Sequence, residues 1–122
     1  MQRRTFIISG ALMAAAAPVM AGGHGRTGTF SGKAGHAASG TAEIDGGTIN
    51  LLGDFSFDGA PDARIALGNN GAHDPATLMG LLKSNTGASS YSVPAGIDSA
   101  GYTEVWIWCE QYSVPLGVAE IN

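Results

Sequence analysis

After residue 27 the chain alternates between apolar and polar residues in short runs, and turn-forming residues separate these runs. Alternation with period two places every second side chain on the same face of an extended strand. Glycine, asparagine, aspartate, serine and proline cluster between the runs, as they do in the turns of β proteins. The pattern predicts an all-β protein, a single antiparallel β-sandwich domain, with strands inside the segments 27–35, 38–62, 63–71, 89–96 and 103–121.

The segment 38–62 shows this alternation over its second half. Ile49, Leu51, Phe55 and Phe57 all have odd numbers, so they share one face of an extended chain. We expect this face to be buried. We also expect the strand to run on through Gly53, where a β-bulge fits.

Shorter patterns predict the neighbouring elements. Gly46 and Gly47 stand between two isoleucine-containing runs and predict a tight hairpin, because glycine adopts positive φ angles readily. Ile65 and Leu67 alternate in the same way and predict a further strand. Residues 76–83 (ATLMGLLK) are the stretch best suited to a brief helix.

The closing segment contains the sequence VWIWCEQYSVPLG. A continuous strand over 105–114 places an aliphatic set on one face, namely Val105, Ile107 and Cys109. The opposite face carries an aromatic set, namely Trp106, Trp108 and Tyr112. We expect the aromatic set to pack against a second sheet, and binding of a sugar ring or relay of electrons are the alternatives.

The first 21 residues have the composition of an export signal. Arg3 and Arg4 precede an apolar segment that ends in small residues, with Val19 and Ala21 at the −3 and −1 positions of a cleavage site. The apolar segment is short for a membrane anchor. The string RRTFII resembles the twin-arginine signal of bacteria, and general secretion is the alternative route.

These features divide the chain into three parts: a twin-arginine-like signal peptide over 1–21, a flexible lead-in over 22–27 and one folded domain over 28–122. We therefore expect a bacterial protein that is exported to the periplasm or the cell exterior. After cleavage of the signal we expect no membrane span.

Charge narrows the range of partners. Residues 22–122 carry four basic and ten acidic side chains, a formal net charge of −6. The basic residues are scattered singly, so the chain has no basic cluster on which a phosphate backbone or an anionic lipid could dock. We expect no nucleic-acid partner.

Cys109 is the sole cysteine, so an internal disulfide is impossible. Its place on the aliphatic face favours a small buried hydrophobe. Exported proteins, however, mostly pair their cysteines or lack them, and an unpaired thiol in an oxidising compartment must be hidden or used. The residues alone leave both roles open.

Three stretches resemble one known family in their order and spacing. They are GHAASGTA with His36, FSFDGAPDARIALG with its acidic turn, and the closing VWIWCEQYSVPLGVAEI. Together they are similar to the electron-transfer DM-thirteen domain, which accompanies DOMON domains in animal Skeletor-type proteins and also occurs as small exported bacterial proteins. The likeness runs from about residue 28 to residue 121, although residues 72–79 (AHDPATLM) match less closely.

The resemblance implies a β-sandwich with a redox or electron-transfer role, built around the cysteine that matches Cys109 and served by a redox protein partner. It offers His36 as the modulator of that thiol, because a nearby imidazole favours the reactive thiolate. Cofactor assignments do not carry over to the single-domain form, so the resemblance leaves the cofactor unknown, and we do not expect a classical enzyme. The rival interpretation is a non-catalytic interaction or ligand-binding module in which Cys109 is merely packed.

Other chemistries find little support in the spacing. A blue-copper site needs histidine and methionine ligands close behind the cysteine, and neither residue type follows Cys109. Convergence of His24, His36 and His73 on the thiol has no support from their spacing, so we predict no metal site. The chain lacks the motif for attachment of a c-type haem.

The acidic residues and the thiol raise two more alternatives. The aspartates Asp54, Asp58 and Asp62 have the spacing of turn residues rather than of a calcium loop. Hydrolysis by Cys109 with His36 is disfavoured, since a nucleophile on the inner face of a strand lacks access and an oxyanion hole.

Overall fold

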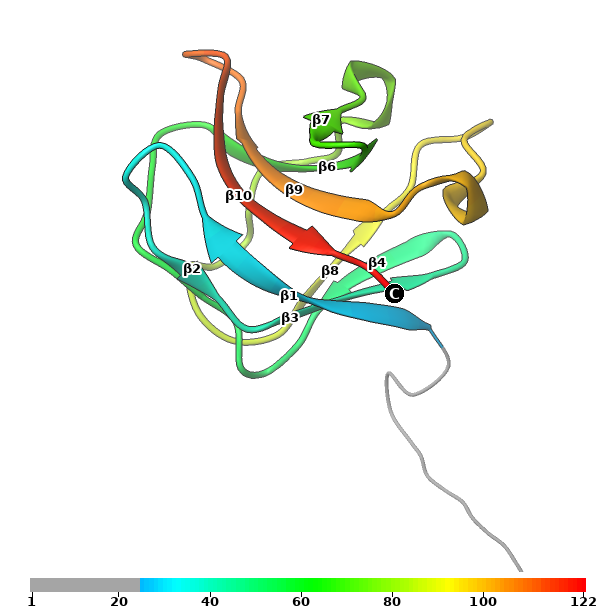
Figure 1. Cartoon of the computed structure of the whole chain (residues 1–122), viewed down its shortest axis with the longest axis horizontal. Coiled ribbons are helices and arrows are strands. Elements are labelled where there is room, and N and C mark those ends of the chain that lie inside the picture. The colour runs from blue at the N-terminus through cyan, green and yellow to red at the C-terminus, as the bar shows by residue number, and fades with distance from the viewer. Residues whose placement is uncertain (1–24) are drawn as a thin grey trace, which may run out of the picture.

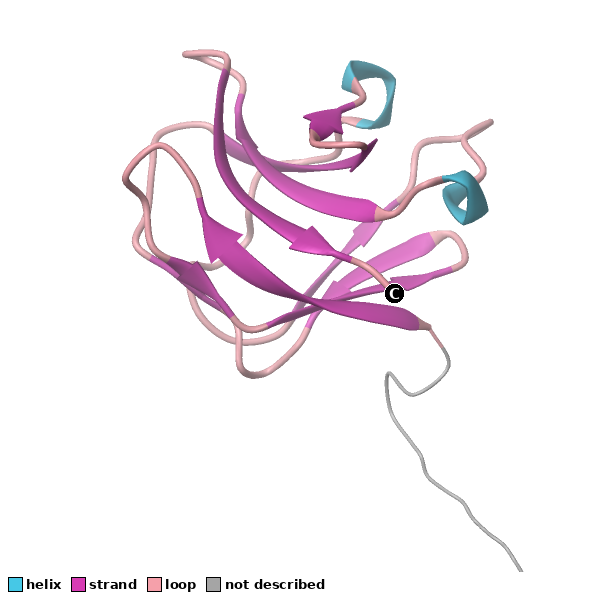
Figure 2. Cartoon of the chain, in the orientation of Figure 1, coloured by secondary structure: helices cyan, strands magenta, loops and turns pink. Residues whose placement is uncertain are grey.

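The computed structural model describes residues 25–122, so the predicted signal peptide lies outside the described residues. The described chain is all-β, with two short 3-10 turns (Figures 1 and 2). The strands are β1 (Arg26–Gly32), β2 (Ala38–Ser39), β3 (Thr41–Asp45), β4 (Thr48–Leu51), β5 (Ser56–Phe57), β6 (Ala63–Asn69), β7 (Ala72–His73), β8 (Ser89–Ser92), β9 (Glu104–Cys109) and β10 (Val114–Glu120). The 3-10 turns are η2 (Pro75–Thr77) and η3 (Ser99–Gly101).

One antiparallel sheet of eight strands, in the order β7-β6-β9-β10-β1-β3-β4-β8, folds over on itself. The fold line is β1, whose residues 26–29 pair with β3 while residues 30–32 pair with β10. Because β1 changes partner halfway, β3, β4 and β8 lie across β6, β9 and β10 (Figure 1). The predicted antiparallel β-sandwich is confirmed, with the two-stranded β2-β5 sheet at one end.

The N-terminal boundary differs from the prediction. β1 begins at Arg26, inside the stretch 22–27 that was expected to be a flexible lead-in. The guanidinium of Arg26 donates hydrogen bonds to the carbonyl oxygens of Tyr102 and Ser99, both at 2.9 Å. These bonds fix the start of the strand against η3.

The buried face expected in residues 49–57 is present. Ile49, Leu51, Phe55 and Phe57 have exposed fractions of 0 to 4% and belong to the main core. The prediction of a continuous strand through Gly53 is wrong, because β4 ends at Leu51 and the next strand, β5, pairs with β2. These four side chains therefore share one core, although they come from β4, from β5 and from the turn between the two strands.

The turn between β4 and β5 accounts for this difference. Asp54 accepts hydrogen bonds from the backbone N–H of Thr41 at 2.9 Å and from its hydroxyl at 2.8 Å. Asp54 thereby ties the turn to the start of β3. The chain leaves the line of β4, and Phe55 still points into the core.

The hairpin and the strand expected beside it are confirmed. β3 and β4 are joined through Gly46 and Gly47, and Gly46 has a φ of +58°. Ile65 and Leu67 are fully buried in β6. The brief helix expected over 76–83 is wrong: beyond η2 the backbone N–H of Met79 bonds to β6 at Ile65, which holds the segment extended.

The closing segment is two strands rather than one. β9 ends at Cys109 and β10 starts at Val114, because Ser113 adopts a left-handed φ of +54° and reverses the chain. The aliphatic set points into the core as predicted. Tyr112 lies in the turn, 63% exposed, and does not share the face of the two tryptophans.

Trp106 packs on the outside of the sandwich. It forms a small second cluster with Ala66 and Val118, which Leu78 covers from the segment after β7. The expectation that the aromatic set packs against a second sheet is therefore wrong. Separately, no helix among residues 25–122 is long and apolar enough to cross a membrane.

Candidate functional site

The acidic turn, residues 58–62 between β5 and β6, is the point where three distant segments meet. Its first residue, Asp58, contacts the segment before β2, and Pro61 contacts the end of β9. Gly59 and Asp62 of this turn both have positive φ values, +97° and +51°. The turn therefore joins the stretches of chain that contain His36 and Cys109.

Cys109 is the last residue of β9 and 1% exposed. It pairs with Ala63 of β6 on one side and with Val114 of β10 on the other. Its Sγ donates a hydrogen bond to the carbonyl oxygen of Pro61 at 3.2 Å. The thiol is thus used as a hydrogen-bond donor to the backbone of the acidic turn.

His36 precedes β2 and is bound to the other end of the acidic turn. Its Nδ1 lies 2.8 Å from Asp58 Oδ1, and its ring lies 5.6 Å from the ring of Phe57, centroid to centroid. The described hydrogen bonds and ion pairs include none between His36 and Cys109. The structure thus brings both predicted site residues to one turn without joining them directly.

The Asp58 carboxylate accepts two hydrogen bonds: Oδ1 from His36 Nδ1, and Oδ2 from the backbone N–H of Ala37 at 3.0 Å. The backbone N–H of Asp58 donates a further bond to the Ala37 carbonyl. The bond from Ala37, followed by the bond to His36, lowers the pKa of Asp58 below its ordinary value of 3.8. Asp58 is accordingly the anchor of the acidic turn.

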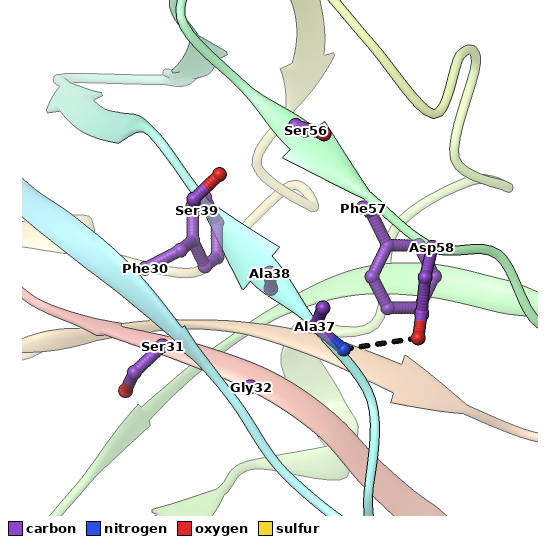
Figure 3. A pocket seen from close by; sticks show the side chains of 9 residues that line it. All are labelled: Phe30, Ser31, Gly32, Ala37, Ala38, Ser39, Ser56, Phe57 and Asp58. Atoms are coloured by element: carbon purple, nitrogen blue, oxygen red, sulfur yellow. Dashed lines mark hydrogen bonds between the residues drawn. The ribbon is translucent and has the colours of Figure 1, made fainter.

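A shallow pocket of about 360 Å³ opens beside this anchor, between β1, β2 and β5 (Figure 3). Phe30 and Phe57 supply its apolar part, and serine hydroxyls and the Asp58 carboxylate supply its polar part. The bond from Ala37 to Asp58 runs along its edge (Figure 3). Cys109 does not line it.

The acidic side chains considered for calcium have protein partners. Asp54 binds Thr41, Asp58 binds His36 and Ala37, and Asp62 pairs with Arg64 at 3.0 Å. Within residues 25–122 no three histidine, cysteine, aspartate or glutamate side chains are grouped closely enough to hold a metal ion. His24 lies outside the described residues.

A second group of polar and aromatic side chains lies on the outer face of β9; the sequence analysis named its tryptophans but missed that His73 belongs to it. His73 of β7 stacks on Trp108, with ring centroids 3.6 Å apart and planes at 21°. Trp108 Nε1 donates to Glu110 Oε1 at 3.2 Å. The spacing of Trp108 and Glu110 was a signal in the sequence, but His73 is far away along the chain.

Burial lowers the pKa of His73 below its ordinary value of 6.5, and the nearby Glu110 and Asp74 oppose this shift. Asp74 in turn accepts a hydrogen bond of 2.5 Å from the hydroxyl of Tyr102. That bond is the main cause of the lowered pKa of Asp74 and the raised pKa of Tyr102. Because burial lowers its pKa, the imidazole of His73 favours the neutral form where it stacks on Trp108.

Comparison with known proteins gives one result. A family model described as Electron transfer DM13 matches residues 29–121, which is almost the whole described domain. No curated protein and no solved structure matches the chain.

Proposed function

Since the chain belongs to the Electron transfer DM13 family, we propose that it is an exported redox module whose working group is Cys109. The observation that carries this proposal is the convergence on the acidic turn: Pro61 holds the thiol and Asp58 holds His36. The three stretches that carry the family likeness thus meet at the acidic turn. Its partner is a redox protein outside the cytoplasm.

The chemistry available to one thiol is a two-electron cycle. The Cys109 sulfur attacks one oxygen of a hydroperoxide, the O–O bond breaks, and water or an alcohol leaves as the thiol becomes a sulfenic acid. A dithiol partner then restores it: its first sulfur displaces water to form a mixed disulfide, and its second releases Cys109 and leaves the partner oxidised. One cysteine is sufficient for this sequence.

Access to the thiol requires the acidic turn to open, since Cys109 is 1% exposed. His36 then acts as a positioning residue, because it helps Asp58 to hold the turn closed. In this proposal His36 modulates the thiol through the turn rather than by touching the sulfur.

The labelling rate of the thiol tests the role of the turn. The variant D58N should raise the rate at which a maleimide or a sulfenic-acid probe modifies Cys109 in the folded protein. The matched control is D54N, which removes a carboxylate that also accepts two hydrogen bonds but ties Thr41 instead. If both variants raise the labelling rate only as far as they lower the free energy of unfolding, a specific role of the turn is contradicted.

A second candidate function is a non-catalytic interaction or ligand-binding module. The burial of Cys109, with its S–H already bonded to Pro61, favours this candidate. It predicts that the native thiol resists peroxide and maleimide and reacts after denaturation alone. It also predicts that C109S retains partner binding.

Export is the remaining part of the proposal. It is supported by Arg3 and Arg4 before the apolar segment and the small residues that follow. Replacing both arginines by lysine keeps the positive charge but should block a twin-arginine translocase. Fractionation of cells that express this double variant distinguishes the two export routes, and cytoplasmic wild-type protein would contradict export.

A further inference from the structure

The outer face of β9 carries two tryptophans, and each indole N–H donates to its own glutamate. Trp106 donates to Glu104 at 3.1 Å and Trp108 donates to Glu110 at 3.2 Å. Residues two apart on a strand are separated by about 7 Å. The two indoles are therefore close neighbours on one face.

The two carboxylates differ in exposure. Glu104 is 6% exposed and also accepts the backbone N–H of Gly71 at 2.8 Å, so it is committed to the fold. Glu110 is exposed to solvent at the end of β9 and can exchange a proton with water. Trp106 is 4% exposed, whereas Trp108 is half-buried.

The surroundings of Trp108 suit loss of an electron from its ring. His73 covers one face of the indole at 3.6 Å as an imidazole that favours the neutral form. Arg64 is the cross-strand neighbour of Trp108 on β6, and Asp62 compensates its positive charge at 3.0 Å. An oxidised indole is strongly acidic at Nε1, where Glu110 already accepts the hydrogen bond.

We propose that Trp108 is the residue through which single electrons enter and leave the domain, with Glu110 as the base that takes and returns the indole proton. A strong one-electron oxidant, of the class of ferryl haem, removes one electron from the Trp108 ring as the Nε1 proton moves to Glu110. A one-electron donor then returns the electron and the proton moves back. The net result is one electron passed from donor to oxidant, and both side chains regain their starting state.

The proposal deepens the electron-transfer assignment and rests on it for its biological use, but it does not require Cys109. Flash photolysis with tris(bipyridine)ruthenium(III) as the oxidant tests it, with transient absorption to distinguish the indolyl radical cation from the neutral radical. In the wild-type protein the neutral radical should form at a rate independent of the concentration of buffer base. Ascorbate, as the donor, should shorten the lifetime of this radical.

The variant E110Q keeps a hydrogen-bond acceptor for Nε1 but removes the base. It should show the radical cation first and form the neutral radical several-fold more slowly, with a rate that depends on buffer base. E120Q is the matched control, since Glu120 is also exposed and the described contacts place it on no indole nitrogen; it should behave as wild type. W108F should lose most of the radical signal.

Two results would overturn the proposal: E110Q kinetics indistinguishable from wild type, or a full radical yield in W108F, which would place the oxidation on Trp106 or Tyr112. C109S separates this proposal from the thiol cycle. It should keep the radical signal and lose the sulfenic-acid signal. The radical signal of Trp108 and the sulfenic-acid signal of Cys109 can therefore be measured independently of each other.

Discussion

The thiol of Cys109 donates a hydrogen bond of 3.2 Å to the carbonyl oxygen of Pro61. This contact joins the end of β9 to the acidic turn, whose other end Asp58 ties to His36 and Ala37. The sulfur is thus a packed core group that contacts the acidic turn. The proposed redox role predicts that its reactivity depends on how often residues 58–62 move away.

Replacement of Cys109 by serine should separate packing from chemistry. The serine hydroxyl can donate to Pro61 in place of the thiol, so we expect C109S to fold with a loss of about 1 kcal/mol in the free energy of unfolding. Urea denaturation measures this loss. The same variant should no longer be modified by a sulfenic-acid probe after treatment with peroxide, and persistent modification would show that another residue reacts.

Acid should weaken the acidic turn. The folded-state pKa of Asp58 lies below its ordinary value of 3.8, so its contribution to stability is present above that value and is lost as pH falls through the folded pKa. In D58N the fall in the urea midpoint between neutral pH and pH about 2 should be smaller than in wild type. An unchanged acid dependence in D58N would mean that Asp58 is equally bonded in the unfolded chain.

The imidazole of His73 should make the stability depend on pH in a higher pH range than Asp58 does. Its folded pKa is lowered below 6.5, so the unfolded chain binds more protons and stability falls as pH drops from 6.5 through the folded pKa. H73F keeps a ring on Trp108 and should flatten this part of the profile. Thermal denaturation of both proteins from neutral to mildly acidic pH measures it, and parallel profiles would contradict the assignment.

Gly68 should be intolerant of a side chain. A Cβ atom there would overlap the carbonyl oxygen of Ala72 and lie 2.5 Å from Trp106 Nε1. We expect G68A to cost about 1 to 3 kcal/mol and to displace β7, with its His73, from Trp108. Chemical denaturation and the tryptophan emission spectrum report both effects.

The control for this substitution is G80A. A Cβ atom at Gly80 meets nothing within 4 Å, and its φ lies outside the left-handed region. Its effect on stability should lie within about 0.5 kcal/mol, as is usual for a surface change. If G68A is equally mild, the close approach of β7 and Trp106 is not required by the fold.

The sequence by itself determined the elements whose cause is local. Alternation of side chains identified the buried sets in β4, β6 and β9, because the period of a strand is a property of the chain itself. Gly46 and Gly47 predicted their hairpin, since the tight turn depends on the angles of these two residues. The order of three short stretches was sufficient to identify the family that the comparison confirms.

Tertiary structure decided where the chain turns and which distant side chains meet. Asp54 interrupts the expected strand by bonding to Thr41, and Ser113 reverses the chain inside the segment expected to be one strand. Strand periodicity carries no information on such breaks, because they arise from contacts across the fold and from a left-handed residue other than glycine.

The contacts of the candidate sites were likewise set by the register between strands. The imidazole of His73 on β7 lies on the indole of Trp108 on β9, although 34 residues separate them in sequence. Cys109 contacts Pro61 at the end of β9, and the pairing of β2 with β5 brings His36 to Asp58. Residue types along a chain indicate which groups are available for chemistry. The pairing of distant strands decides which of these groups come into contact.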